Sequence, residues 1–138
     1  MREILFRGKR ADNGEWVDGD HFRDPDLETD EIIGYQYYTD EEGPQREPYC
    51  HKVIPETVGQ YTGIEDKNGK RAYEGDIVWC ENDEEYGIVE WDKDTARFVV
   101  RFYTFTADFD NLYGDEIEIV GNAYDNPEMM EAIEEDNE

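Results

Sequence analysis

Residues 59–78 constrain the fold of this chain more than any other stretch, because they encode two closely spaced reversals of chain direction. Asn68-Gly69 is a dipeptide that readily adopts the left-handed conformations of a tight hairpin turn, and β-compatible residues lie on both sides of it. A second break, at Glu74-Gly75-Asp76, precedes Ile77-Val78-Trp79, which is typical of a buried strand. The stretch therefore predicts a hairpin followed by a further strand.

Short apolar segments separated by turn residues continue through the second half, without an amphipathic pattern of helical length. The predicted strands cover residues 60–64, 71–74, 77–82, 86–92, 97–105 and 116–121. Several short strands with small turns favour a small SH3-like barrel or a curled antiparallel sheet over residues 59–124, because a small open sheet would expose hydrophobic edges. Phe98, Val100 and Phe102 share one face of their strand, and we expect one face of that strand to be core.

The N-terminal region is predicted to contain a β-hairpin at Asn13-Gly14, between residues 4–6 and 15–17. Residues 31–38 predict a strand in which alternation buries Tyr35 and Tyr37 and exposes Tyr38. Packing within the sheet is favoured for these tyrosines over a protein-contact surface. Polar residues and prolines predict surface loops at 23–30 and 39–48. Residues 53–58 fit either a short helical turn or an extended connector.

A short C-terminal helix is predicted from residue 127 to 135. Asn126 can cap it, Pro127 suits its first position, and residues 134–138 are expected to fray into solvent. The fold class is thus mainly β. A chain of 138 residues fits a single domain, with a hairpin and acidic loop region at 1–58, a barrel-like core at 59–124, and a helix with an acidic tail at 125–138.

A net charge of −25 makes direct binding to nucleic acid improbable and steers basic partners toward the chain. The acidic excess is concentrated in residues 24–48 and 102–138, and we expect stability to rise with added salt. Only two cysteines occur, which favours a reduced, cytoplasmic setting. Charge interrupts the first residues, so neither a secretion signal nor a membrane span is predicted. A homo-oligomer remains open.

The reactive side chains do not form a recognisable catalytic or metal-binding pattern. Cys50, His51, Cys80 and His21 offer zinc ligands, but the spacing is poor and adjacent Cys50 and His51 point to opposite faces of an extended strand. The acidic run Asp108, Asp110, Asp115 and Glu116 lacks the glycine of a calcium loop, and the glycines do not match a phosphate-binding loop. We therefore predict no catalytic, cofactor-binding or metal-binding residues, no cofactor, and no enzymatic activity.

Several motifs carry a resemblance to a known family. They are Val53 with Glu56-Thr57-Val58-Gly59-Gln60-Tyr61-Thr62-Gly63, Asp66-Lys67-Asn68-Gly69-Lys70, Tyr73-Glu74-Gly75-Asp76-Ile77-Val78, and Val120-Gly121-Asn122 with Tyr124-Asp125-Asn126-Pro127-Glu128. With the opening Arg2-Glu3-Ile4, Phe6 and Arg7, they resemble the YopX family of phage and prophage proteins. The resemblance implies a mostly β fold and phage origin, and it transfers no catalytic residue. Residues 18–52 depart most from the pattern, so we expect differences in partner to lie there.

The resulting functional prediction is a phage- or prophage-encoded accessory protein that binds a host or phage protein of unknown identity, without direct contact to nucleic acid or membrane. The alternative is an acidic mimic of DNA that inhibits a host nuclease or DNA-binding protein. An enzyme with a carboxylate pair in the mouth of the barrel ranks last, because no His, Ser or Cys accompanies the acids in a recognisable arrangement.

Overall fold

The computed structural model describes residues 3–108 and 116–134. Their fold is mainly β, with antiparallel sheets and a short C-terminal helix, as predicted. The chain divides into two compact units, Met1–Gln60 and Tyr61–Glu138. The division lies two residues beyond the predicted 58/59 boundary, and the grouping of all regions into a single domain stays a prediction.

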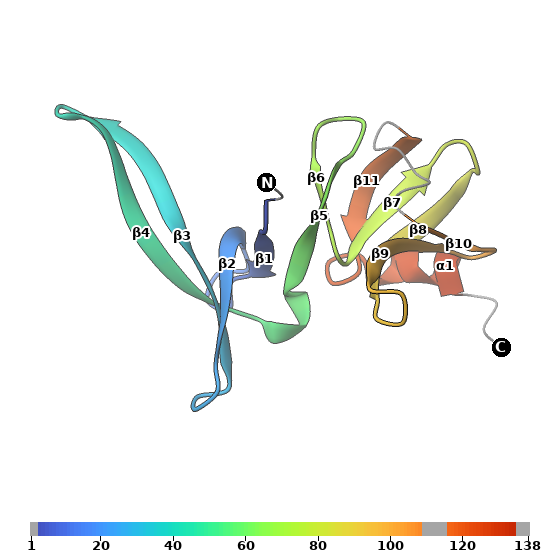
Figure 1. The fold of residues 1–138 in the computed structure, drawn as a ribbon, viewed down its shortest axis with the longest axis horizontal. Helices are drawn as coiled ribbons and strands as arrows, with labels where there is room; N and C mark the ends of the chain where they lie inside the picture. Colours follow the sequence, from blue (N-terminus) through green and yellow to red (C-terminus); the bar gives the residue numbers. More distant parts are fainter. Residues whose placement is uncertain (1–2, 109–115, 135–138) are drawn as a thin grey trace. The chain divides into compact units, whose positions relative to one another are not determined.

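The first unit contains four antiparallel strands in the spatial order β4-β3-β2-β1 (Figure 1). They are β1 (Phe6–Lys9), β2 (Trp16–Asp24), β3 (Thr29–Asp40) and β4 (Gly43–Val53), followed by the 3₁₀ turn η1 (Pro55–Thr57). The first residues of β5 (Gly59–Glu65) pair with β1. The hairpin predicted at Asn13-Gly14 is confirmed. Of the two conformations predicted for residues 53–58, a short helical turn or an extended connector, the structure has the helical turn, as η1.

A small core and a set of backbone bonds hold the base of this unit. Ile32 and Val53 are buried, and Arg10 forms an isolated bridge with Val53. The backbone N–H of Lys9 donates to Oγ1 of Thr57 at 2.8 Å. These contacts join the end of β1 to the end of β4 and to η1. The base is therefore stabilised by backbone pairing more than by burial of apolar side chains.

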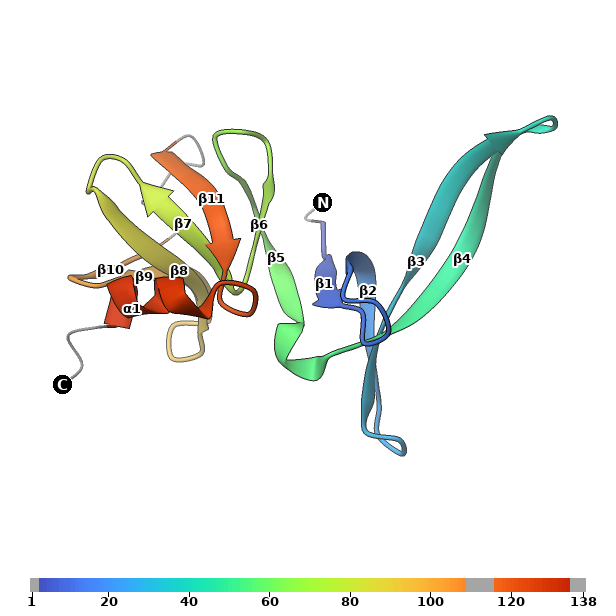
Figure 2. The ribbon, with the colours of Figure 1, turned by 180° about the vertical axis from the view of Figure 1, so that it is seen from behind.

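The hairpin of β3 and β4 continues well past the point where β2 stops pairing with β3. The pairing of β2 with β3 stops at Asp20 and Ile33, whereas β3 and β4 stay paired out to Asp40 and Gly43. We name residues 34–49 the arm, and both ribbon views show it as a two-stranded extension (Figures 1 and 2). The predicted loop at 39–48 is therefore wrong, because only Glu41 and Glu42 connect the strands; the predicted loop at 23–30 shrinks to residues 25–28.

The second unit contains the rest of β5 and a five-stranded antiparallel sheet in the order β10-β9-β8-β7-β11. Its remaining elements are β6 (Arg71–Tyr73), β7 (Asp76–Cys80), β8 (Glu85–Asp92), β9 (Arg97–Phe102), β10 (Thr106–Asp108), β11 (Ile117–Asn122), the 3₁₀ turn η4 (Pro127–Met130) and α1 (Glu131–Glu134). All six predicted strands are confirmed, and β10 is additional. The pairings between described strands do not close a ring, so the SH3-like barrel stays a prediction.

Apolar side chains cover both faces of this sheet. One face belongs to a cluster with Ala72 of β6 that contains Val78, Cys80, Val89, Val100, Phe102 and Ile117, and Phe98 packs against it as expected. On the other face, Ile77 and Ile88 contact Ile133 of α1. The predicted apolar stripe of the C-terminal helix is confirmed, since Met129 and Met130 pack against the same cluster.

The start of the C-terminal helix differs from the prediction. Pro127 takes the first position, but Asn126 makes no side-chain cap; its Oδ1 accepts a hydrogen bond from the backbone N–H of Asn122 at 3.1 Å. The segment therefore begins as a 3₁₀ turn before α1. Arg101 holds α1 to the sheet, because its guanidinium donates to both Glu90 and Glu134 at 3.0 Å. The predicted fraying of residues 134–138 is wrong for Glu134, which is the last residue of α1 and binds Arg101; residues 135–138 lie outside the described residues.

The Asn68-Gly69 turn is held by the buried carboxylate of Asp66. One oxygen accepts from the backbone N–H groups of Asn68 and Lys70, at 2.8 and 2.9 Å. The other accepts from the N–H of Ile119 in β11, at 2.9 Å. Gly69 has φ +81°, the left-handed conformation that glycine adopts without strain. Asp66 thus closes the hairpin and ties it to a strand 53 residues away.

Replacing Asp66 by Asn tests this tie. The Asn side chain keeps one acceptor oxygen, but its NH₂ group replaces the oxygen that accepts from Ile119, so a buried donor loses its partner. We expect the free energy of unfolding to fall by about 2–3 kcal/mol. Urea unfolding followed by tryptophan fluorescence measures the change. Asp94→Asn, in an exposed turn, is the control and should stay within about 0.5 kcal/mol of wild type; an Asp66→Asn variant as stable as this control would refute the assignment.

The same contacts predict a pH dependence. Burial by itself raises the pKa of Asp66, but the hydrogen bonds from Ile119, Lys70 and Asn68 outweigh it and hold the pKa below its usual value. A lowered pKa means that the stabilisation is complete above about pH 4 and is lost as pH falls through the folded-state pKa. The difference in stability between wild type and Asp66→Asn should therefore be flat at neutral pH and shrink below about pH 4. A constant difference down to about pH 2 would contradict this.

Candidate functional site

The arm exposes aromatic side chains on both of its faces. Tyr35 is 47% exposed, Tyr37 73% and Tyr38 46%, although large aromatic residues are usually covered in a sheet. The prediction that Tyr35 and Tyr37 are buried is wrong, because β2 ends its pairing at Ile33 and no described residue covers β3 beyond it. The exposure predicted for Tyr38 is confirmed. All six residues from Tyr35 to Asp40 are exposed.

The pairing register sorts the arm into two faces of different chemistry. Tyr35 lies opposite Pro48 and Tyr37 opposite Arg46. The Arg46 guanidinium lies 4.5 Å from the centre of the Tyr35 ring, a cation–π contact that restricts both side chains. We name the side with Tyr35, Tyr37, Pro44, Arg46 and Pro48 the proline face, since side chains two residues apart in a strand share a face.

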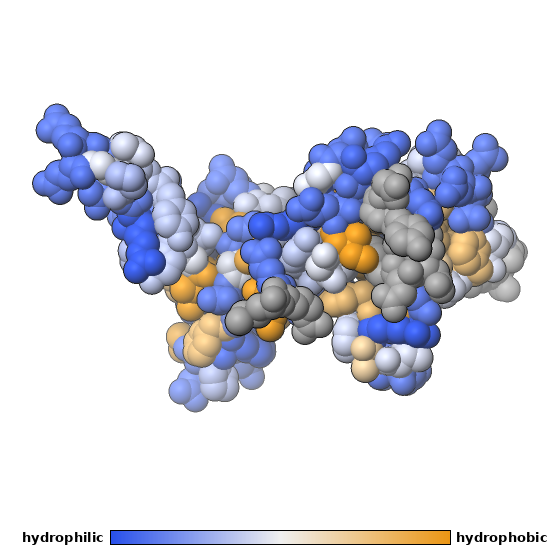
Figure 3. Space-filling view, turned by 45° about the horizontal axis from the view of Figure 1, so that its top comes forward, coloured by the Kyte–Doolittle hydropathy of each residue, from blue (hydrophilic) through white to orange (hydrophobic). Residues whose placement is uncertain are grey.

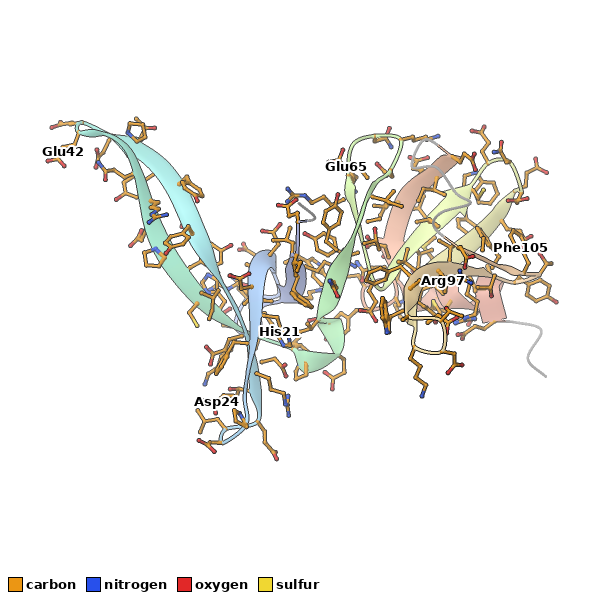
Figure 4. All side chains as sticks on the ribbon, viewed as in Figure 1. His21, Asp24, Glu42, Glu65, Arg97 and Phe105 are labelled. Carbon is orange, nitrogen blue, oxygen red and sulfur yellow. The ribbon has the colours of Figure 1, made fainter. Side chains whose placement is uncertain are left out.

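The opposite side is acidic. It carries Tyr38, Asp40 and Glu47, and we name it the acidic face. Asp40 also caps the turn, since its Oδ1 accepts from the backbone N–H of Glu42 at 2.8 Å. Glu42 lies at the tip, over which the surface is strongly hydrophilic (Figures 3 and 4). Residues 34–49 contain four acidic side chains and a single basic one, so the arm carries negative charge.

Tyr49 anchors the base of the arm to β2. Its hydroxyl donates to the backbone carbonyl of Asp18 at 2.5 Å. The ring lies across Gly34, where a Cβ would come within 2.6 Å of the Tyr49 oxygen. Burial and the nearby Asp18 carboxylate raise the pKa of Tyr49, so the hydroxyl stays protonated at neutral pH and keeps donating. The arm therefore projects from a fixed base.

A second polar cluster connects β2 to β3 below the arm. Asp30 is 5% exposed. Its carboxylate forms hydrogen bonds with Nε2 of His21 and Nη1 of Arg23, each at 2.6 Å (His21 is labelled in Figure 4). A buried carboxylate requires such partners. No local sequence pattern indicates this cluster, since its members come from two strands and only the pairing register brings them together. We assign it a structural role.

The zinc ligands that the sequence offered have other contacts in the structure. Cys50 donates its thiol proton to Glu31, which raises the pKa of the thiol, while His51 stacks on Tyr49. Cys80 is a buried core residue of the second unit, and burial raises its pKa as well. A raised pKa disfavours the thiolate that a nucleophile or zinc ligand needs. Among residues 3–108 and 116–134, no three His, Cys, Asp or Glu side chains group as metal ligands.

The acidic run of the second unit is only partly described. Asp108 pairs with Arg97, whose Nε lies 3.0 Å from its carboxylate, so this acid already has a cation. Asp110 and Asp115 lie outside the described residues. Within the part of the chain that the structure describes, no helix has the length and apolarity needed to cross a membrane.

Comparison with known proteins identifies the family. A solved structure, the crystal structure of protein EF1440 from Enterococcus faecalis, is similar at 20% sequence identity and a TM-score of 0.60, over 94% of this chain and 99% of that one. At this identity the likeness concerns the fold alone. No curated protein matches. The family model described as YopX protein matches residues 5–131, nearly the whole length, and the chain therefore belongs to the YopX family.

Proposed function

We propose that this protein is a non-enzymatic interaction module, encoded by a phage or prophage, that binds a host or phage protein in the cytoplasm through the arm. The observation that carries the proposal is the exposed run from Tyr35 to Asp40, with three tyrosines on a two-stranded ribbon. A free two-stranded ribbon is marginally stable in water, so a long one with aromatic side chains gains most when a partner covers it.

The contacts of the arm favour a binding role over plain structural packing. Tyrosine side chains are enriched among the residues that contribute most to protein interfaces, since they bury a large area at low entropic cost. The cation–π contact of Arg46 with Tyr35 and the hydrogen bond of Tyr49 to Asp18 restrict the arm before binding. Such preorganisation lowers the entropy lost on association.

The charge of the chain supports a basic partner. A net charge of −25 attracts a positively charged surface at long range, and the acidic side chains of the arm continue that field to its tip. A basic protein with an apolar pocket would match both the negative charge of the chain and the exposed tyrosines of the arm. Electrostatic steering of this kind weakens as salt screens the charges.

Binding should be lost when the most exposed tyrosine of the arm is removed. We expect tagged wild-type chain to recover a host or phage protein at about 50 mM salt and less of it at about 300 mM. Tyr37→Ala should weaken that complex about 30-fold, which corresponds to a central interface residue. Recovery from lysate identifies the partner, and titration with the purified partner measures the affinity.

The matched control is Phe22→Ala, which removes an exposed aromatic side chain of β2 outside the arm. Circular dichroism of both variants establishes that they fold. A partner that binds Tyr37→Ala and Phe22→Ala equally well would show that the arm is not the contact surface. Failure to recover any specific protein at either salt concentration would also reject the proposal.

The second candidate function is an acidic mimic of DNA, and the net charge of −25 favours it. Against it, cations are interspersed among the acids of the second unit, as in the pairs of Lys67 with Glu118 and Arg97 with Asp108. If the protein mimics DNA, a stoichiometric amount of it should inhibit restriction or repair nucleases. The Tyr37→Ala variant should inhibit the same nucleases equally well. Absence of inhibition at stoichiometric excess would reject it.

A further inference from the structure

The backbone of the arm has one blocked edge and one open edge. At the base of β4, the carbonyl of Lys52 accepts from Ala11, and the N–H of Ile54 donates to the carbonyl of Lys9. These bonds point away from β3. Because N–H and C=O groups alternate in direction along a strand, every even-numbered residue of β4 directs its backbone outward, away from β3.

The outward positions of β4 within the arm include both of its prolines. Residues 44, 46 and 48 point outward by this alternation, and two of the three are Pro44 and Pro48, which have no N–H to donate. Proline at outward positions protects a sheet edge against a further strand. The β4 edge of the arm is therefore blocked.

The outward positions of β3 have no such protection. The unbroken register pairs the odd-numbered residues of β4 with the even-numbered residues of β3, so Tyr35, Tyr37 and Thr39 direct their N–H and C=O groups away from β4. β2 would be the neighbour on that side, but its pairing stops at Ile33. Three residues thus present an extended, exposed edge with both donors and acceptors.

We propose that this open edge, Tyr35 to Thr39, binds an extended segment of a basic partner protein as an additional antiparallel or parallel strand. The inference rests on the proposed function and specifies how the arm would bind. Main-chain hydrogen bonds supply affinity in strand addition, and alternate side chains supply specificity. The blocked β4 edge directs the added strand to one side of the arm.

The two faces of the arm define the pattern of the partner segment. Side chains of a strand added beside β3 alternate between the acidic face, where β3 presents Tyr38 and Asp40, and the proline face, where it presents Tyr35 and Tyr37. Opposite charges and pairs of aromatic with β-branched residues are favourable across neighbouring strands. The partner segment should therefore alternate basic residues with β-branched apolar ones.

A second copy of the chain fits this edge less well. Each copy brings a net charge of −25, and the arm contains only one basic residue, Arg46, whose guanidinium already lies over Tyr35. Two such arms side by side would repel each other, whereas a basic segment is attracted. Charge complementarity thus selects a heterologous partner.

The test uses the full chain and an eight-residue peptide of alternating Lys and Val. Its control is the same peptide with every backbone nitrogen methylated, which keeps charge and side chains but cannot pair as a strand. We expect the unmethylated peptide to slow hydrogen exchange of the Tyr35, Tyr37 and Thr39 amides, measured by NMR, and to leave the Arg46 amide unchanged. The methylated peptide should bind at least about tenfold more weakly.

Substitutions at Thr39 distinguish the contribution of the backbone N–H to binding from that of the side chain. Thr39→Pro removes one outward N–H and should weaken binding of the unmethylated peptide about tenfold, whereas Thr39→Ala keeps the N–H and should bind like wild type. Both variants retain the tyrosines of the arm. Circular dichroism and the amide spectrum of the second unit check that they fold.

Other outcomes would overturn the inference in distinguishable ways. Equal affinity for both peptides, without amide protection on β3, would exclude strand addition; if Tyr37→Ala still weakened both, the proposed function would survive. Protection of Arg46 would place the strand on the wrong edge. Protection that rises with protein concentration without peptide would indicate a second copy as the occupant. Absence of binding by either peptide would reject the inference, and the proposed function would then depend on the recovered partner alone.

Discussion

The alternating direction of backbone groups along a strand is the constraint on which the binding properties of the arm depend. Each residue of β3 can direct its N–H and C=O groups to one neighbour only, and the register with β4 takes every second residue. β2 uses the remaining groups as far as Ile33, where its pairing with β3 stops. What remains is a short edge of unpaired donors and acceptors, flanked by tyrosines, on a ribbon whose other edge carries prolines. An unpaired strand edge promotes aggregation, and most sheets protect it. In the arm the β4 edge is protected by its prolines, whereas the β3 edge is open.

In the second unit, by contrast, side chains supply hydrogen-bond partners for backbone groups that strand pairing leaves free. There, the carboxylate of Asp66 satisfies N–H groups of the turn and of β11 that would otherwise be buried without partners. Apolar side chains cover both faces of the sheet, and Arg101 attaches the final helix. The unit has the features of a stable scaffold. The first unit has few buried apolar side chains, and three of its exposed aromatic residues lie in the arm.

Local turn chemistry made much of this fold predictable. Asn68-Gly69 and Asn13-Gly14 located two hairpins, and the strands of the second unit followed from alternation between turns. The arm was missed because Pro44, Pro48 and the acidic residues between Thr39 and Glu47 favour a loop, although proline is compatible with outward positions of an edge strand. Alternation also assigned Tyr35 and Tyr37 correctly to one face but could not show that this face lacks a cover. Asp66 and Asp30 depend on partners from distant strands, which local patterns do not reveal.

Cross-strand NOEs between Hα protons of the unbound chain test the register of the arm directly. In antiparallel pairs without mutual hydrogen bonds the two Cα atoms are closest, at about 4.5 Å. This register requires strong Hα contacts of Tyr37 with Arg46 and of Tyr35 with Pro48. Strong contacts of Gln36 with Glu47 or of Tyr38 with Gln45 instead, or none along the arm, would place the free backbone groups elsewhere and contradict it.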